Sequence, residues 1–151
     1  MEPGGVRPVV GSDGGEWFVT ADRAGAGVSG EARVGGGVVV VLFTLTVEAV
    51  EPGARVRVWI QQSADTVAWD DLVAYPEATA PGAWTARVVA DAALTPGIEP
   101  RLDGELAPNT VRALPLAHRF RVRWHVEGGS ARFGATAQAI VLASASRRTA
   151  T

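Results

Sequence analysis

Two segments of the chain alternate between apolar and polar side chains, with Trp59 as the one apolar residue at a position of the polar side. In residues 55–61 every second residue is apolar, and residues 119–126 repeat this scheme with larger apolar groups. Side chains of a strand point alternately to the two faces of a sheet, whereas a helix needs a longer spacing. Both segments are therefore predicted to be strands with one face on a core, which favours an all-β fold. The predicted inward side chains are Val56, Val58, Ile60, Phe120, Val122, Trp124 and Val126.

Turn residues follow each alternating segment and predict two hairpins. After the first segment, residues 62–65 (Gln-Ser-Ala-Asp) form a tight polar turn, and residues 68–72 (Ala-Trp-Asp-Asp-Leu) the return strand. After the second segment, residues 127–130 (Glu-Gly-Gly-Ser) are the expected turn, and residues 132–142 the expected last strand.

The rest of the chain predicts one domain with further strands. We expect strands at residues 16–20, 37–50 and 84–89, and a small-residue loop at 21–30. A long irregular loop is expected at residues 90–117, which contain several prolines and glycines. The expected architecture is a single antiparallel β-sandwich over residues 16–142, jelly-roll or immunoglobulin-like, with the strand order left open. The expected flexible ends are an N-terminal arm at residues 1–15 and a tail at residues 143–151.

Composition argues against several kinds of partner. The net charge is −2 and all 14 basic residues are arginines, so no overall positive field would attract nucleic acid. The lack of cysteine excludes disulfides and thiolate zinc sites. The longest apolar run, residues 37–43, is far shorter than the roughly 20 residues that cross a bilayer. The N-terminus shows no basic-then-apolar leader, so we expect a soluble protein made in the cytoplasm, with no membrane partner.

Few residues are suited to catalysis or metal binding. His118 and His125 are seven positions apart, which on a strand places them on opposite faces. No Gly-x-Ser-x-Gly motif is present, and the glycine-rich residues 34–38 lack the Lys and Ser/Thr of a phosphate loop. Asp65, Asp70 and Asp71 leave calcium as an alternative, although an aspartate in a turn also caps its own backbone. We expect a non-enzymatic protein without catalytic residues, cofactor or metal.

A stripe of arginines supplies the first candidate contact residues. Arg119, Arg121 and Arg123 point to one face of their predicted strand, and Arg55 and Arg57 join that face if the two strands pair. One interpretation is a solvated face balanced by nearby carboxylates. The other is a surface for a partner that carries carboxylates, since arginine makes bidentate pairs and is enriched in interfaces.

Two tryptophans are the other candidate contact residues. Trp59 is predicted to point away from the core, and Trp69 lies beside a turn. Exposed tryptophans anchor binding surfaces, and tryptophans also cover small cores, so both interpretations stay open.

The order of these motifs resembles that of small β-sandwich proteins that decorate or stabilise the heads of tailed bacteriophages. The residues that carry the resemblance are the 62–72 turn and return strand (Gln-Ser-Ala-Asp-Thr-Val-Ala-Trp-Asp-Asp-Leu), the 120–129 strand with its Gly-Gly, and Phe133. The resemblance covers roughly residues 38 to 142. The chain departs from the family pattern at Thr66, where glycine is usual, and in the length of the 90–117 loop.

The resemblance implies a structural role without catalysis. The expected function is a virion protein on the capsid exterior that binds the lattice of the major capsid protein, with a homotrimer as one option. Alternatives are a ring subunit of the neck or tail, and a carbohydrate-binding module on the virion surface that uses Trp59 and Trp69 as its platform.

Overall fold

The computed structural model describes residues 5–11, 16–90 and 96–141, and every regular element in these ranges is a β-strand. The strands are β1 (Val6–Val9), β2 (Phe18–Val28), β3 (Ala32–Arg33), β4 (Val38–Val50), β5 (Arg55–Ser63), β6 (Asp70–Ala74), β7 (Gly82–Val89), β8 (Thr110–Val111) and β9 (Arg119–Val141). All strand pairs are antiparallel, which confirms the predicted antiparallel all-β class. In the same ranges, no helix is long and apolar enough to cross a membrane.

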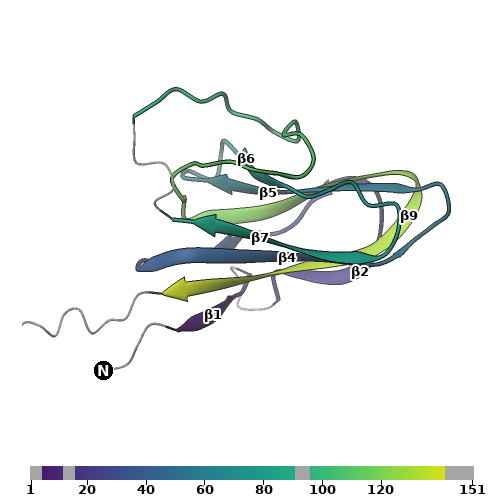
Figure 1. Cartoon of the computed structure of the whole chain (residues 1–151), viewed down its shortest axis with the longest axis horizontal. Helices are drawn as coiled ribbons and strands as arrows, with labels where there is room; N and C mark the ends of the chain where they lie inside the picture. Colours follow the sequence, from purple (N-terminus) through teal and green to yellow (C-terminus); the bar gives the residue numbers. More distant parts are fainter. Residues whose placement is uncertain (1–4, 12–15, 91–95, 142–151) are drawn as a thin grey trace, which may run out of the picture.

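Strand β9 organises the fold because it belongs to two parts of the sheet. Its first half pairs with β5, which continues to β6 and β8, and its second half pairs with β4, which continues to β7. Strands β1, β2 and β3 pair along the other edge of β9. The sheet therefore folds over into two facing layers and nearly closes into a barrel (Figure 1). We call the part with β5, β6 and β8 layer A, and the part with β4 and β7 layer B.

A glycine pair bends β9 between the two layers, in place of the predicted hairpin turn. The strand runs without a break through Gly128 and Gly129, so the prediction of two strands joined by a turn is wrong. Gly128 has a φ of 77°, and a Cβ at this position would lie 2.5 Å from the carbonyl oxygen of Gly53. Only glycine fits such a left-handed and crowded position. A Gly-Gly pair can end a strand or bend it. Here it bends the strand, because β2 pairs with β9 on both sides of the glycines.

The N-terminal region is more ordered than the sequence predicted. The expected flexible arm contains β1, whose residues pair with the end of β9. The expected loop at residues 21–30 is instead the continuation of β2. Its small residues weaken the alternation signal, but they are needed for packing: a Cβ on Gly27 would overlap the ring of Trp124. Both strands pair with β9, more than 90 positions away in sequence, and such long-range pairing leaves little local signal.

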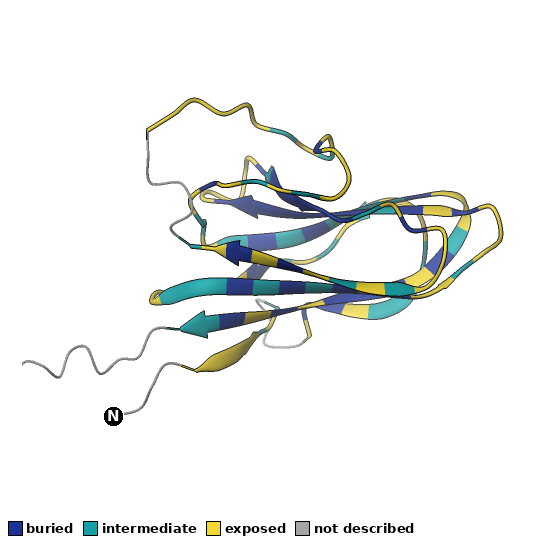
Figure 2. Cartoon of the chain, viewed as in Figure 1, coloured by how far each residue is buried: buried dark blue, intermediate teal, exposed yellow. Residues whose placement is uncertain are grey.

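The predicted inward faces of the long strands form the core between the layers (Figure 2). Phe43 and Phe120 are fully buried, with ring centroids 5.3 Å apart, and they join layer B to layer A. Tyr75, at the end of layer A, donates its hydroxyl to the carbonyl oxygen of Phe43 at 2.6 Å. Burial of that hydroxyl raises the pKa of Tyr75. Trp124 was predicted to be core but is half-buried, packed against Phe18 and Phe133.

The long loop lies over the outer side of layer A (Figures 1 and 2). It is irregular as predicted, apart from β8, which pairs with β6. Residues 91–95 of this loop and the predicted tail at 143–151 lie outside the described residues, as do 1–4 and 12–15 of the predicted arm.

Candidate functional site

The arginine stripe predicted from the sequence exists on the outer side of layer A. Strands β5 and β9 pair directly, and their register places alternate residues of both strands on that side. The five residues that share it are Arg55, Arg57, Arg119, Arg121 and Arg123, which we call the arginine face. The condition for this prediction, pairing of the two strands, is therefore confirmed.

A segment of the long loop covers much of the arginine face, and we call it the lid (residues 100–106). The fully buried carboxylate of Asp71 on β6 holds the lid in place. The backbone N–H groups of residues 104, 105 and 106 donate to its two oxygens at 2.9, 2.8 and 3.0 Å. The side-chain amide of Gln61 adds a fourth hydrogen bond at 2.8 Å. One carboxylate thus satisfies three consecutive amides of an irregular segment, which explains how the segment can lie against a sheet.

Asp70 holds the start of the lid. Its Oδ1 accepts hydrogen bonds from the N–H of Leu102 at 2.8 Å and from Arg112 Nη1 at 2.7 Å. Arg112 also donates from Nη2 to the carbonyl oxygen of Pro100 at 2.7 Å. The guanidinium thereby links β6 to the lid, and its side chain is only 9% exposed.

Carboxylates of the same chain balance the arginine face. Asp103 in the lid accepts a hydrogen bond from Arg123 at 3.0 Å, and its carboxylate lies 3.8 Å from Arg121. Burial lowers the pKa of Arg121, and the charge of Asp103 partly opposes this shift. Further ion pairs are Arg119–Glu31 at 3.3 Å and Arg55–Glu127 at 2.6 Å. The face is therefore balanced internally, as one interpretation predicted, but the lid covers much of it where that interpretation expected solvent.

Both candidate tryptophans are buried, so the interpretation that they form an exposed platform is wrong. Trp59 is 3% exposed and donates its indole N–H to the carbonyl oxygen of Leu106 at 3.0 Å. Trp69 is 6% exposed, and the guanidinium of Arg121 lies 4.5 Å from its ring centroid. Alternation predicted correctly that Trp59 points away from the main core. It gave no sign that the lid would form a small second core over this side chain, with Leu106 as a member.

The third candidate aspartate caps its own turn. Asp65 Oδ1 accepts hydrogen bonds from the N–H groups of Val67 and Ala68, both at 2.9 Å. The bond from Ala68 is the largest cause of a lowered pKa of Asp65. Thr66 has a φ of 64°, a left-handed conformation that glycine adopts without strain. The aspartates considered for calcium thus use their oxygens on N–H donors, and no cluster of three metal-ligating side chains occurs in the part of the chain that the structure describes.

The outer side of layer B differs from the arginine face because it is almost free of charge and nothing in the described chain covers it. The register places its members in rows across β1, β9, β4 and β7. The row through Val6, Ile140, Val40 and Val89 is apolar, and the row through Thr136, Thr44 and Thr85 consists of threonines. The residues of the other rows are uncharged apart from Arg87. The members are Val6, Pro8, Val40, Leu42, Thr44, Thr46, Ala83, Thr85, Val89, Thr136, Gln138 and Ile140, which we call the neutral face. Arg87 is the one charged side chain in these rows.

The apolar row of the neutral face is open to solvent at both ends. Val6 is 57% exposed at the β1 end and Val89 is 40% exposed at the β7 end. In the threonine row, the hydroxyls of Thr44 and Thr85 hydrogen-bond to each other at 2.9 Å. These hydroxyls satisfy one another, so their desolvation by a partner would cost less than that of isolated polar groups.

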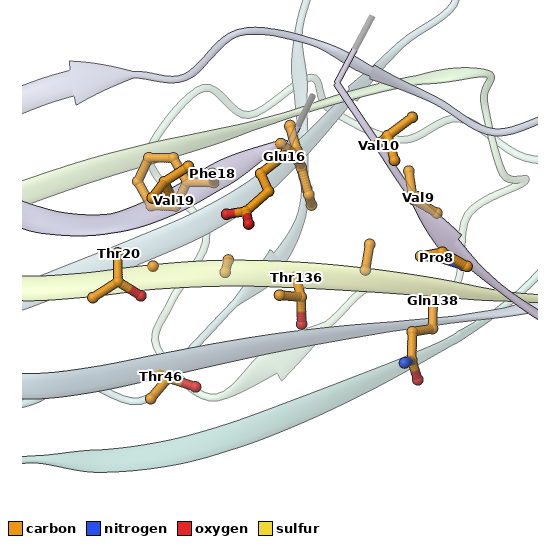
Figure 3. A pocket seen from close by; sticks show the side chains of 14 residues that line it. Pro8, Val9, Val10, Glu16, Phe18, Val19, Thr20, Thr46, Thr136 and Gln138 are labelled. Carbon is orange, nitrogen blue, oxygen red and sulfur yellow. The ribbon is translucent and has the colours of Figure 1, made fainter. Parts of the chain in front are cut away.

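A pocket of about 360 Å³ lies at the edge of the neutral face, between β1 and β2 (Figure 3). Thr136 and Gln138 line it from β9, and Pro8 lines it from β1. Glu16 is the only charged residue among those that line it. One carboxylate among threonines and valines provides no pair of groups for acid–base or nucleophilic chemistry. The pocket is a hollow at the edge of the neutral face, lined by small and apolar residues and by the carboxylate of Glu16.

Sequence reasoning did not select the neutral face, although part of the signal was present. The strand at residues 37–50 shows an outward side that is apolar at its start and carries threonines further on. The alanine-rich last strand supplies the neighbouring row. Charged and aromatic residues are the usual markers of binding sites, and this face has few of either. A scan against family models found no match for this chain, and searches of curated proteins and of solved structures found none either.

Proposed function

We propose that this chain is a non-enzymatic structural protein that docks on the lattice of a major capsid protein through its neutral face and decorates the exterior of a tailed-phage head. The proposal combines the sequence resemblance with one structural observation. The lid covers much of the charged outer side of the fold, and four of its five arginines pair with carboxylates of the same chain, whereas the uncharged outer side is open in the described residues.

The neutral face has properties suited to docking on a protein surface. Its side chains are short and mostly β-branched, so they lose little conformational entropy on contact. Almost no ionised group would have to be desolvated, since Arg87 is the one charge in its rows. The pocket beside Glu16 offers a place for a protruding side chain of the lattice protein. A partner for this face is expected to be apolar and flat, not acidic as the arginine stripe first suggested.

A repeated lattice would compensate for modest affinity at each site. Many equivalent positions on a shell keep a decoration protein bound at high occupancy, and self-association, for which a homotrimer was one expectation, would add avidity. A ring subunit of a neck or tail is the second candidate, because it would use an open neutral face in the same way at a few positions only.

The test is co-sedimentation of the purified protein with empty, mature phage heads, measured as copies bound per head. Saturation at a high copy number that matches the lattice symmetry supports decoration, and saturation at a few copies supports the neck or tail. Absence of binding contradicts the proposal.

Two matched variants test the face itself. Thr136→Arg places a charge in the centre of the neutral face, and Val67→Arg places the same charge in the β5–β6 turn, where the side chain is 82% exposed. Thr136→Arg should reduce binding at least about tenfold, because the new charge must be desolvated. Val67→Arg should bind like the wild type. Equal loss in both variants, or in neither, contradicts docking through the neutral face.

A further inference from the structure

Strand β7 is an edge strand of the sheet that the structure describes. It pairs with β4 on one side, at the end of the strand order, and its register with β4 has no bulge from Gly82 to Val89. Just beyond the strand, the N–H of Ala90 donates to the carbonyl oxygen of Val39 at 2.9 Å. The even-numbered residues of β7 therefore direct their backbone groups toward β4. By alternation, the residues whose backbone N–H and C=O groups point to the free side are Ala83, Thr85, Arg87 and Val89.

This edge lacks the features by which proteins usually protect free strands. Short length, proline, bulges and charged side chains are the common devices against pairing with another chain. Strand β1 has four residues and contains Pro8, and β8 has only two. Strand β7 has eight residues, no proline and, in Arg87, a single charged residue. Strand β2 is also an edge strand and is longer, but its pairing with β9 has two register irregularities and it contains Asp22 and Arg23. Among the edges of the described sheet, β7 is therefore the long one without a bulge and with a single charge.

The space beside β7 is open and without charge. A groove of about 380 Å³ lies between β7 and the β6–β8 edge of layer A. None of the residues that line it is acidic or basic. Ala83 and Thr85, two of the residues whose backbone groups point away from β4, line this groove.

We propose that a second copy of this chain occupies this edge, with the two β7 strands paired antiparallel about a twofold axis at Ala86. In this register Ala83 lies opposite Val89 of the second copy, and Thr85 lies opposite Arg87. Every residue with free backbone groups on β7 then has a hydrogen-bonding partner.

Charge selects this register over its neighbour. A shift of the twofold axis by one residue toward the C-terminus would place Arg87 opposite Arg87 of the second copy, which is destabilising. A shift in the other direction would leave Val89 opposite Pro81, which has no N–H to donate. The dimer joins two copies of layer B into one sheet and does not depend on the capsid proposal.

The experiment is sedimentation equilibrium of the isolated full chain across a hundredfold range of concentration, which needs no phage heads. The wild type should show twice the chain mass. Thr85→Pro removes one N–H from the free edge and leaves the bonds to β4 intact, so it should shift the mass to that of a monomer. Thr85→Val keeps the N–H and should remain a dimer. Circular dichroism and the thermal midpoint verify that each variant is folded.

A cysteine variant tests the register. The chain has no cysteine, so Ala86→Cys introduces a single thiol at the proposed axis. Directly opposed residues of a non-hydrogen-bonded pair lie within disulfide range, so mild oxidation should convert Ala86→Cys to a covalent dimer. Thr85→Cys, opposite Arg87, should react much more slowly. A wild-type monomer or trimer, a dimeric Thr85→Pro, or equal cross-linking of the two cysteine variants overturns the proposal.

Discussion

Replacement of Asp71 by alanine should release the lid and strongly destabilise the fold. The carboxylate accepts four N–H groups, three from the lid and one from Gln61. The amides of Gly104 and Glu105 can reach water once this part of the lid opens, but Gln61 lies in β5 and Leu106 packs in the small core with Trp59, so both are buried. Each lost hydrogen bond to a charged acceptor at a buried group costs about 1.5–3 kcal/mol, so the two together give about 3–6 kcal/mol. This is a large part of the roughly 5–15 kcal/mol that stabilises a typical domain.

The assay is urea denaturation, with hydrogen exchange as a local readout. A loss of this size corresponds to a fall of about 2 M in the urea midpoint. Amides 104 and 105 should lose protection in the variant before the amides of the sheet. Asp71→Asn keeps one carbonyl oxygen and should lose about half as much stability. Asp22→Ala is the control, because that side chain is 78% exposed and its nearest cation is 3.9 Å away. A midpoint for Asp71→Ala within the range of the control would refute the role of Asp71 as the anchor of the lid.

Four further outcomes are expected. Gly128→Ala should cost about 2–4 kcal/mol in urea denaturation, because of its positive φ and the contact with Gly53, whereas Gly25→Ala, with a positive φ but open space, should cost about 1 kcal/mol. Tyr75→Phe should cost about 1 kcal/mol in the same assay, since it removes one buried hydrogen bond. Asp65 should titrate below 3.8 in an NMR pH series; its folded pKa is lowered, so its stabilisation is present above the unfolded pKa and disappears as pH falls through the folded value. Binding to heads through the neutral face should change less than about threefold between low and high salt, in contrast to binding through an exposed arginine stripe.

Alternation was sufficient to predict which residues share a face, but not what covers that face. The inward positions of residues 55–61 and 119–126 and the hairpin at Asp65 follow from local spacing, and the structure confirms them. The lid over Trp59 depends on Asp71, whose partners lie more than 30 positions away. The continuation of β9 through Gly128 depends on pairing with β2, about 100 positions away. Contacts of that range leave no periodic trace in the sequence, so the covered face looked exposed and the bend looked like a turn.

The residues that carry the resemblance to phage head proteins have structural tasks in this chain. Asp65 and Thr66 shape the turn, Trp69 is buried beneath Arg121, and Asp70 and Asp71 hold the lid. A motif of this kind serves the fold of the chain, because the turn and the anchors of the lid are needed whatever the partner is. It does not identify the contact surface, since Trp69 and Asp71 are buried and the aspartates are engaged in hydrogen bonds within the chain. The choice of partner surface therefore depends on which outer side the lid leaves open, and this is why Thr136→Arg on the neutral face is a more direct test of function than any change within the motif.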